Sequence, residues 1–323
     1  MNKNNLQHFQ PSLGKKVDFV VNPGEYFLNE IVGQDEAIDE LVSFKNMILN
    51  KNIYQYWSTL IPKGILLEGP TGTGKTISVR ALANELGNGV KLIEISYKNI
   101  ASRYMDAPIE NLREYFSTAE KYSEECHVII FIDEIDAMLP QRNNETHEVT
   151  NRRVNVFLEW LDGGFQSMKN ITLIGSTNFK ENIDKAILRP GRIDKIIHFN
   201  NLTDAAIIKG LKLYLEKKNY NEHQVGHIDW DLVASSLKSQ ILSGADIGAI
   251  VESIVSNKAK EHYSILQKET TGKIGHEDFN FNEIHNEKFH PSPITTETII
   301  QGVSTYIQSR YGYLLERPYA LAS

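Results

Sequence analysis

A glycine-rich loop between two strongly patterned segments constrains this chain more than any other feature. The stretch GILLEGPTGTGKTISVRALANELG runs from Gly64 to Gly87. Residues 64–69 form an apolar run typical of a buried strand, and the residues after Lys75 have the pattern of a helix. Glycine permits backbone angles that are closed to other residues, so successive amide N–H groups of the loop can turn inward. The loop is therefore suited to binding an anion such as phosphate.

The spacing within this loop fits the P-loop pattern G-x-x-x-x-G-K-[ST]. Gly69, Gly74, Lys75 and Thr76 occupy its four fixed positions. We expect the backbone amides and the helix dipole to hold the inner phosphates of ATP, Lys75 to reach the β- and γ-phosphates and Thr76 to coordinate Mg²⁺. A bland glycine turn is the alternative, but both flanking segments have the type and order that a nucleotide site requires. The predicted nucleotide-binding residues here are Gly69, Pro70, Thr71, Gly72, Thr73, Gly74, Lys75, Thr76 and Ile77.

Composition and charge exclude several classes of protein. The 323 residues are 41% hydrophobic and 23% charged, without an apolar run near the roughly 18 residues of a membrane span. The first ten residues lack the apolar core of a signal peptide, so a cytoplasmic location is expected. The single cysteine, Cys126, excludes an intramolecular disulfide and a Cys-based zinc site within one chain. A net charge of −7 argues against nucleic acid as the main partner.

Strand and helix patterns alternate through the first two thirds of the chain. Short apolar runs separated by helical patterning follow the P-loop strand at residues 91–96, 128–134, 171–178 and 195–200. Such alternation predicts an α/β fold, a three-layer αβα P-loop NTPase whose five-stranded parallel sheet carries helices on both faces. Ligands of such sheets bind at the carboxyl ends of the strands, which is where the P-loop lies.

The chain divides into three parts by pattern. Residues 1–28 read as an irregular N-terminal segment, and residues 29–200 as the large ATPase domain. Residues 201–323 have helical patterns without strand signals and predict a smaller helical domain. Within it, residues at about 270–293 read as a long loop whose histidines match no metal signature.

A second motif supplies the carboxylates that phosphoryl transfer needs. The buried strand of VIIFIDEID ends at Asp133, whose carboxylate is predicted to hold Mg²⁺ beside Thr76. Glu134 follows and is placed to polarise the attacking water. The fourth strand ends at Asn178, which would face the γ-phosphate if that strand lies between the other two. A strand that ends in an acidic turn, and an Asn that only forms a turn, are the structural alternatives.

With these pieces in order, the chain resembles the AAA branch of the AAA+ ATPases. The stretch STNFKENIDKAILRPGRID is similar to that branch's second region of homology. The resemblance implies that Asn178 is the sensor 1 residue, and that Arg189 and Arg192 are arginine fingers reaching the ATP of a neighbouring subunit in a ring. A Pro-Gly turn between two arginines fits a rigid, exposed, cationic projection, although a solvated basic turn is the alternative.

Further motifs extend the resemblance to the helical domain, which it implies is the small AAA+ lid. EIVGQDEA is similar to the family's entry motif, and LSGADIGAIV to the segment that packs on the nucleotide. Ala245 stands where other AAA+ branches have the sensor 2 arginine. Tyr214 stands where many relatives have a nucleotide-contacting His. The nucleotide contacts that the resemblance implies are Ile31, Val32, Gly33, Tyr214, Gly244 and Ala245.

Two more segments concern the assembled ring. DGGF, residues 162–165, resembles the inter-subunit signalling motif Asp-Gly-Phe with one extra glycine. Alignment with the family places Tyr104 and Met105 at the pore-loop positions, where an aromatic-Met pair suits gripping a polypeptide. Asp106 stands where the pore loop usually has glycine. Ordinary packing is the alternative for Tyr104 and Met105.

The nearest likeness is to the ATPase module of FtsH-type metalloproteases, followed by protein-unfolding and katanin-like AAA proteins. These 323 residues contain no His-Glu-x-x-His, so the kinship covers the motor. The leading hypothesis is an Mg²⁺-dependent ATP hydrolase that forms a homo-oligomeric ring, expected to be a hexamer, and remodels or unfolds a protein. The expected partner is a protein substrate or an adaptor, and an adaptor or a companion subunit would supply recognition. The alternatives are a nucleotide-gated scaffold without threading and a nucleic-acid motor.

Overall fold

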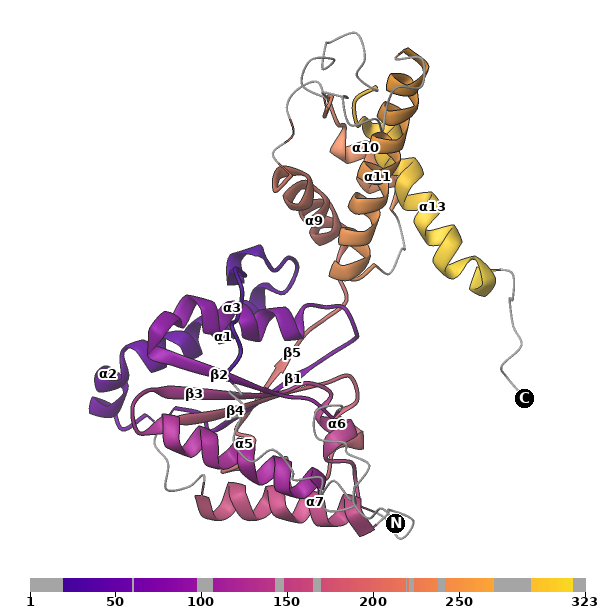
Figure 1. The fold of residues 1–323 in the computed structure, drawn as a ribbon. Coiled ribbons are helices and arrows are strands. Elements are labelled where there is room, and N and C mark those ends of the chain that lie inside the picture. The colour runs from indigo at the N-terminus through magenta and orange to yellow at the C-terminus, as the bar shows by residue number, and fades with distance from the viewer. Residues whose placement is uncertain are drawn as a thin grey trace, which may run out of the picture.

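The computed structural model separates the chain into an α/β part and a helical part (Figure 1). The structure describes residues 20–59, 61–97, 107–142, 148–164, 170–218, 220, 224–237, 242–269 and 292–315.

Five parallel strands form one sheet in the order β2-β3-β4-β1-β5. Strand β4 therefore lies between β1, which leads into the P-loop, and β3, which leads to Asp133, and this meets the condition under which Asn178 would face the γ-phosphate. The register pairs Glu68 of β1 with Thr177 of β4, so the three strands end at one edge. The strands are β1 (Gly64–Glu68), β2 (Val90–Ile95), β3 (His127–Ile132), β4 (Ile171–Thr177) and β5 (Lys195–His198).

Helices cover both faces of the sheet, and the predicted three-layer architecture is confirmed (Figure 1). Helices α1 and α3 lie on one face, and α5 and α7 on the other. The helices of this part are η1 (Leu28–Glu30), α1 (Asp35–Leu49), α2 (Lys51–Tyr56), α3 (Lys75–Leu86), η2 (Gly87–Gly89), α5 (Ala107–Ser123), α6 (Ile135–Met138), α7 (Glu148–Glu159), η3 (Trp160–Gly164) and η4 (Lys180–Asn182).

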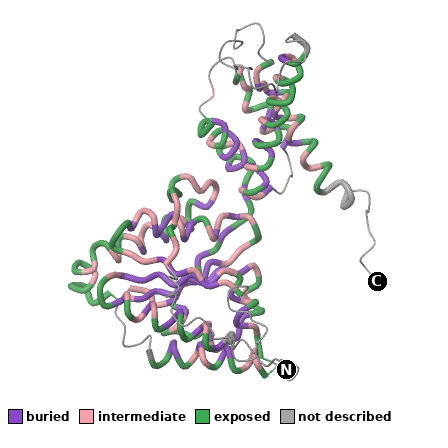
Figure 2. Tube along the Cα trace, in the orientation of Figure 1, coloured by how far each residue is buried: buried purple, intermediate pink, exposed green. Residues whose placement is uncertain are grey.

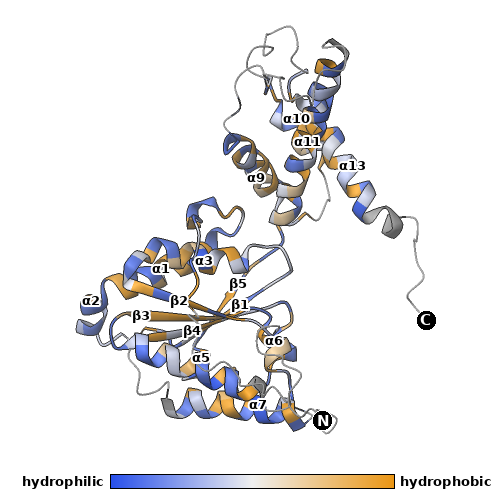
Figure 3. Ribbon diagram, viewed as in Figure 1, coloured by the Kyte–Doolittle hydropathy of each residue, from blue (hydrophilic) through white to orange (hydrophobic). Residues whose placement is uncertain are grey.

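The continuous apolar strands of the sequence are buried on both sides. Ile65 and Leu67 of β1 pack into the core beneath α1 and α3, whereas Leu66 between them packs into the core beneath α5 and α7. Figure 2 shows the strands buried between exposed helix faces, and Figure 3 shows the same strands as the most apolar elements. Because nearly all residues of the central strands β1, β3 and β4 meet one of two cores, a run of apolar residues replaces the alternating pattern of a half-exposed sheet. The edge strands β2 and β5 are only partly buried.

The segment before η1 pairs with the sheet edge, although its sequence reads as irregular. Val20 forms an isolated antiparallel bridge with Ile93 of β2, and the Val21 amide donates to the Leu92 carbonyl at 2.9 Å. Leu28 is buried in the core beneath α1 and α3. Local pattern could not reveal this because the partner strand lies far along the chain.

The helical part follows β5 and has a core of its own. Helix α9 begins after Thr203, whose side chain accepts a hydrogen bond from the Ala206 amide, and α10 begins after a similar cap at Asp229. The predicted boundary at residue 200 falls between β5 and α9. Within the described ranges, no helix has the length and apolar character needed to cross a membrane. The helices are α9 (Asp204–Glu216), α10 (Trp230–Ser236), α11 (Gly244–Glu269) and α13 (Thr296–Leu315).

Candidate nucleotide-binding site

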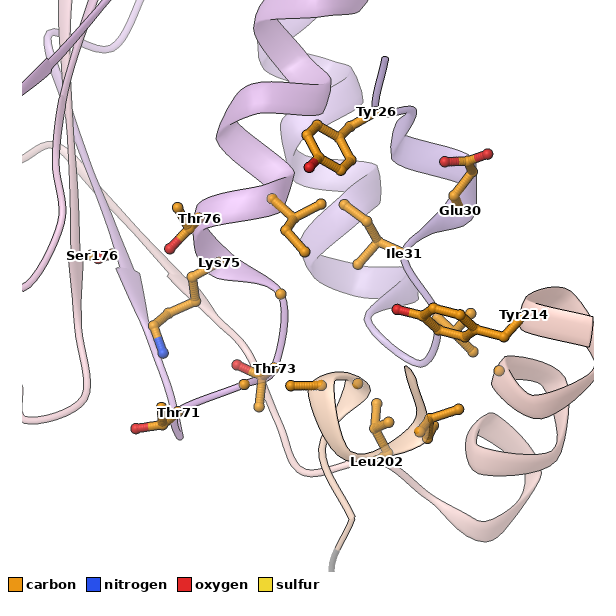
Figure 4. A pocket seen from close by; sticks show the side chains of 18 of the residues that line it. Tyr26, Glu30, Ile31, Thr71, Thr73, Lys75, Thr76, Ser176, Leu202 and Tyr214 are labelled. Atoms are coloured by element: carbon orange, nitrogen blue, oxygen red, sulfur yellow. The ribbon is translucent and has the colours of Figure 1, made fainter. Parts of the chain in front are cut away.

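A cavity of about 440 Å³ lies at the carboxyl edge of the sheet and is lined by both parts of the chain. Its floor is the loop between β1 and α3, in which Gly72 and Gly74 have φ angles of +79° and +101°. These left-handed angles favour glycine and let the loop wrap tightly before α3 begins at Lys75. Figure 4 shows Lys75, Thr71 and Thr73 at one end of the cavity, and Tyr26, Ile31 and Tyr214 at the other.

Lys75 is held at the phosphate end by three oxygen acceptors. Its ammonium donates to the carbonyls of Gly69 and Pro70, at 2.6 and 2.8 Å, and to Asn178 Oδ1 at 2.9 Å. Burial lowers the pKa of Lys75, while Asp133 and Asp136 act in the opposite direction. The three contacts hold the Lys75 ammonium within the loop.

Asp133 joins the P-loop helix to the neighbouring strand. The Thr76 hydroxyl donates to Asp133 Oδ2 at 2.9 Å, and the Ser176 hydroxyl donates to Oδ1. A hydroxyl and a carboxylate are the hard oxygen ligands that Mg²⁺ prefers, so Thr76 and Asp133 fit the predicted metal site. Ser176 of β4 was missed by the sequence reasoning, and its only signal was its place two residues before Asn178 at the strand end.

Glu134 lies directly after β3 in an unusual backbone conformation. Its φ and ψ are both 52°, in the left-handed region, and it precedes α6 as the N-cap residue. The Glu134 amide donates to Ser176 Oγ at 3.2 Å and to Asp133 Oδ1 at 3.1 Å, which holds the turn in place. Its side chain is exposed and lines the cavity, where a carboxylate can accept a proton from water.

Asn178 bridges the two sides of the phosphate end. Its Oδ1 accepts from Lys75, and its Nδ2 donates to Thr71 Oγ1 at 3.0 Å. The parallel pairing of β4 with β1 brings this residue to the loop from more than a hundred positions away. The structure thus assembles Thr71, Lys75 and Asn178 into one hydrogen-bonded set.

The other end of the cavity is more apolar and suits a base. The predicted residues Ile31, Val32 and Tyr214 line it, whereas Gly244 and Ala245 line the cavity beside Gly72, at the phosphate end. An ion pair of 2.7 Å between Lys217 of α9 and Glu30 of η1 crosses this end. Sequence reasoning missed several further lining residues, which are Tyr26, Phe27, Glu30, Leu202, Gly210, Leu213, Lys217 and Ile247.

Three of the predicted nucleotide contacts, Gly33, Gly69 and Pro70, do not line the cavity. Gly33 has a φ of +73°, and a Cβ atom there would lie 2.6 Å from the Cβ of Ala206, so this glycine permits close packing of the helical part. Pro70 instead orders the loop from behind, because its carbonyl accepts from Lys75 and from Thr73 Oγ1 at 2.8 Å.

The two predicted arginine fingers lie outside the cavity lining. Arg189 is exposed, but the side chain of Arg192 is only 15% exposed. Its guanidinium donates to both carboxylate oxygens of Asp162, at 2.8 and 2.6 Å, and to the Ala186 carbonyl. The expectation that Arg192 projects freely is therefore wrong for the single chain. The pore-loop residues Tyr104 and Met105 lie outside the described residues, as does Phe165 of the DGGF stretch.

Comparison with known proteins agrees with this geometry. Residues 65–201 match the family described as ATPase family associated with various cellular activities (AAA). The chain is 33% identical over 236 residues to ATP-dependent zinc metalloprotease FtsH 2 of Thermoanaerobacter sp., covering 72% of this chain and 44% of that protein. It is 33% identical over 240 residues to the FtsH of Mycobacterium tuberculosis, covering 73% of this chain and 30% of that one. It is 34% identical over 225 residues to the FtsH of Rubrobacter xylanophilus, with 69% and 33% covered.

The matched region spans less than half the length of these curated relatives. It contains the P-loop, Asp133, Asn178 and the five-stranded sheet that positions them. Residues 65–201 therefore form a domain of the AAA family of ATPases.

Proposed function

We propose that this chain is an Mg²⁺-dependent ATPase subunit of a ring, and that the ring couples ATP hydrolysis to the remodelling or unfolding of a protein. The observation that carries the proposal is the convergence of Lys75, Thr76, Asp133 and Asn178 at one edge of the sheet through hydrogen bonds of 2.9 Å. A phosphate cradle, a metal ligand pair and a polar γ-phosphate contact are what phosphoryl transfer to water requires.

The base end and the loop orient ATP before reaction. Tyr214 and Ile31 contact the base, and the amides of the loop hold the inner phosphates. Lys75 exchanges its loop carbonyls for oxygens of the β- and γ-phosphates. Thr76 and Asp133 would hold Mg²⁺, which would neutralise charge on the phosphates.

Hydrolysis depends on Glu134 and Asn178. Glu134 takes a proton from the attacking water, which it orients toward the γ-phosphorus. Asn178 donates a hydrogen bond at the γ-phosphate while remaining tied to the loop. Both residues follow buried strands, so their positions are set by the rigid sheet rather than by a mobile loop.

The ring completes the site with charge from a second subunit. Arg189 and Arg192 lie outside the cavity of their own chain, which supports a role toward the ATP of a neighbour. There they stabilise the charge that develops on the transferred phosphoryl group. In that arrangement Arg192 leaves its ion pair with Asp162 when the neighbouring subunit binds ATP.

The steady-state ATPase rate per subunit, measured against protein concentration, tests the hydrolytic and ring parts of the proposal. We expect the rate to rise with concentration and to fall at least about a hundredfold in Glu134→Gln and Arg192→Ala. Lys218→Ala is the matched control, because it removes a surface cation whose ion pair with Glu252 lies away from the phosphate end. A rate independent of concentration and of Arg192 would contradict the ring.

The work on protein is tested separately with Tyr104→Ala. A ring that threads its substrate should keep its basal ATPase rate in this variant and lose the unfolding of an added protein substrate. Unfolding that survives the substitution would favour a nucleotide-gated scaffold over threading.

A further inference from the structure

A carboxylate on the first turn of α11 is almost completely removed from solvent. Asp246 is 3% exposed and lies two residues after Gly244, which lines the nucleotide cavity. Burial of a charged group is costly unless hydrogen bonds replace its water. The partners of Asp246 therefore show what this residue holds together.

One oxygen of Asp246 closes the start of its own helix. The amide and hydroxyl of Ser243 donate to Oδ2, at 2.8 and 2.7 Å, and the Asp246 amide donates back to Ser243 Oγ at 3.2 Å. This reciprocal pattern is a capping box with Asp in place of the usual Glu or Gln. It makes residues 243–246 a rigid first turn.

That turn rests directly on the P-loop. The Gly244 amide donates to the Gly72 carbonyl at 3.0 Å. A Cβ atom on Gly72 would lie 2.6 Å from Ser243 Oγ and 3.6 Å from the Cβ of Ala245. The position of this turn therefore sets one wall of the phosphate cradle.

The second oxygen of Asp246 is held by the distant helix α13. Tyr306 Oη donates to Oδ1 at 2.7 Å, and Arg310 Nη1 donates to the same atom at 2.7 Å. Arg310 also donates to the Tyr306 hydroxyl, so the three groups form a closed set. The capping box of α11 uses only Oδ2 of Asp246. The two hydrogen bonds to Oδ1 therefore connect α11 to α13 and are not needed to start the helix.

Charge and packing support this tie. Burial raises the pKa of Asp246, but hydrogen bonds from Ser243 and Tyr306 together with the Arg310 charge bring the pKa below its ordinary value. Helix α13 is anchored by Ile299 and Val303 in the core of the helical part. The carboxylate is therefore charged and bonded to a fixed neighbour.

We infer that Tyr306 and Arg310 are positioning residues of the nucleotide site, which act through Asp246 to press the first turn of α11 onto Gly72. The inference rests on the proposed nucleotide binding and adds α13 to the elements that set nucleotide affinity. Neither side chain lines the cavity. Their loss should weaken binding, because the wall loosens, while leaving Glu134 and Asn178 in place for the chemical step.

The test measures the dissociation constant of a fluorescent ADP analogue at low protein concentration, together with KM and kcat for ATP. Tyr306→Phe and Arg310→Leu should each raise the dissociation constant and KM by about threefold to tenfold, with kcat changed less than about twofold. Arg310→Lys keeps a cation near Oδ1 and should recover part of the affinity. Ser309→Ala is the matched control, because this exposed hydroxyl on α13 bonds within its own helix to the Tyr306 carbonyl.

Thermal unfolding of the same variants separates positioning from stability. A lower unfolding temperature with an unchanged dissociation constant would overturn the inference and leave a structural role. Wild-type affinity in both Tyr306→Phe and Arg310→Leu would overturn it while the proposed ATPase stands. Absence of nucleotide binding by the wild-type protein would overturn both.

Discussion

Because the backbone of Glu134 is strained, one substitution at this position should change ATP hydrolysis and protein stability in opposite directions. Glu134 has a φ of 52°, and a residue with a Cβ atom in the left-handed region costs roughly 1–2 kcal/mol. Its side chain is exposed, and the hydrogen bonds that hold the turn come from its backbone amide. We expect Glu134→Gly to abolish hydrolysis and at the same time to stabilise the protein.

The magnitude follows from two opposing contributions. Glycine removes the left-handed strain, but it loses more conformational freedom on folding, which costs roughly 0.5–1 kcal/mol. The difference is a net gain of about 0–1.5 kcal/mol in the free energy of unfolding, with a central value of about 0.8 kcal/mol. For a domain of this size that corresponds to a rise of about 1–4 °C in unfolding temperature.

Urea unfolding and ATPase assays of three variants check this prediction. Glu134→Gln should lose hydrolysis with no gain in stability, because its backbone strain remains. Ser58→Gly should gain stability with full activity, since Ser58 is exposed, has a φ of 55° and lies outside the cavity lining. A Glu134→Gly variant that is less stable than Glu134→Gln would refute the reasoning.

Three further predictions concern the metal, the base end and the core. Thr76→Ala should raise the Mg²⁺ concentration for half-maximal ATPase rate at least about tenfold, and Thr76→Ser should restore it. Glu30→Gln should speed release of a fluorescent ADP about twofold to threefold, because the partly exposed ion pair of Glu30 with Lys217 contributes under about 1 kcal/mol. The double variant Glu30→Lys with Lys217→Glu exchanges the two charges and should recover slow release. Equal release rates in the wild type, the single variant and the double variant would rule out a role for the pair. Burial and the charge of Lys51 lower the pKa of His127 to about 4. As the pH falls, the unfolded chain therefore binds a proton at His127 before the folded protein does. The free energy of unfolding should fall by roughly 2 kcal/mol from pH 7 to pH 5, as urea unfolding would measure. This fall should be smaller in His127→Gln.

The sheet was predictable because its central strands, β1, β3 and β4, are buried on both faces. The five apolar runs of the sequence match β1 to β5 with ends that differ by one or two residues, as at β5, which ends at His198 rather than at residue 200. The place of β4 between β1 and β3 was a condition for bringing Asn178 to the loop, and the observed strand order meets that condition. Helix starts depend on local sequence in the same way, since a capping residue such as Thr203 bonds to an amide within the first turn of its helix.

The phosphate end of the site was also predictable, whereas the base end was not. Lys75, Thr76 and Asp133 belong to two motifs that each follow a predicted strand. The carboxyl ends of parallel strands lie at one edge of the sheet, so these residues are expected to lie close together. Tyr26 and Phe27 lie in a polar segment without periodicity, and they reach the cavity only through tertiary packing. No local pattern could show this, and the same holds for the ion pair that turns Arg192 toward Asp162.

The helical part meets the α/β part at both ends of the nucleotide cavity. At the phosphate end, the Gly244 amide bonds to the Gly72 carbonyl, and at the base end Lys217 pairs with Glu30. A nucleotide bound between these contacts would touch both parts. It can favour one relative position of the two parts over another only if it makes better contacts in that position. In the proposed mechanism, loss of the γ-phosphate would change contacts at Lys75 and Asn178, which belong to the α/β part, and would leave the base contacts at Tyr214 unchanged. We therefore expect the phosphate end, through Gly72 and the first turn of α11, to carry the signal of hydrolysis to the helical part.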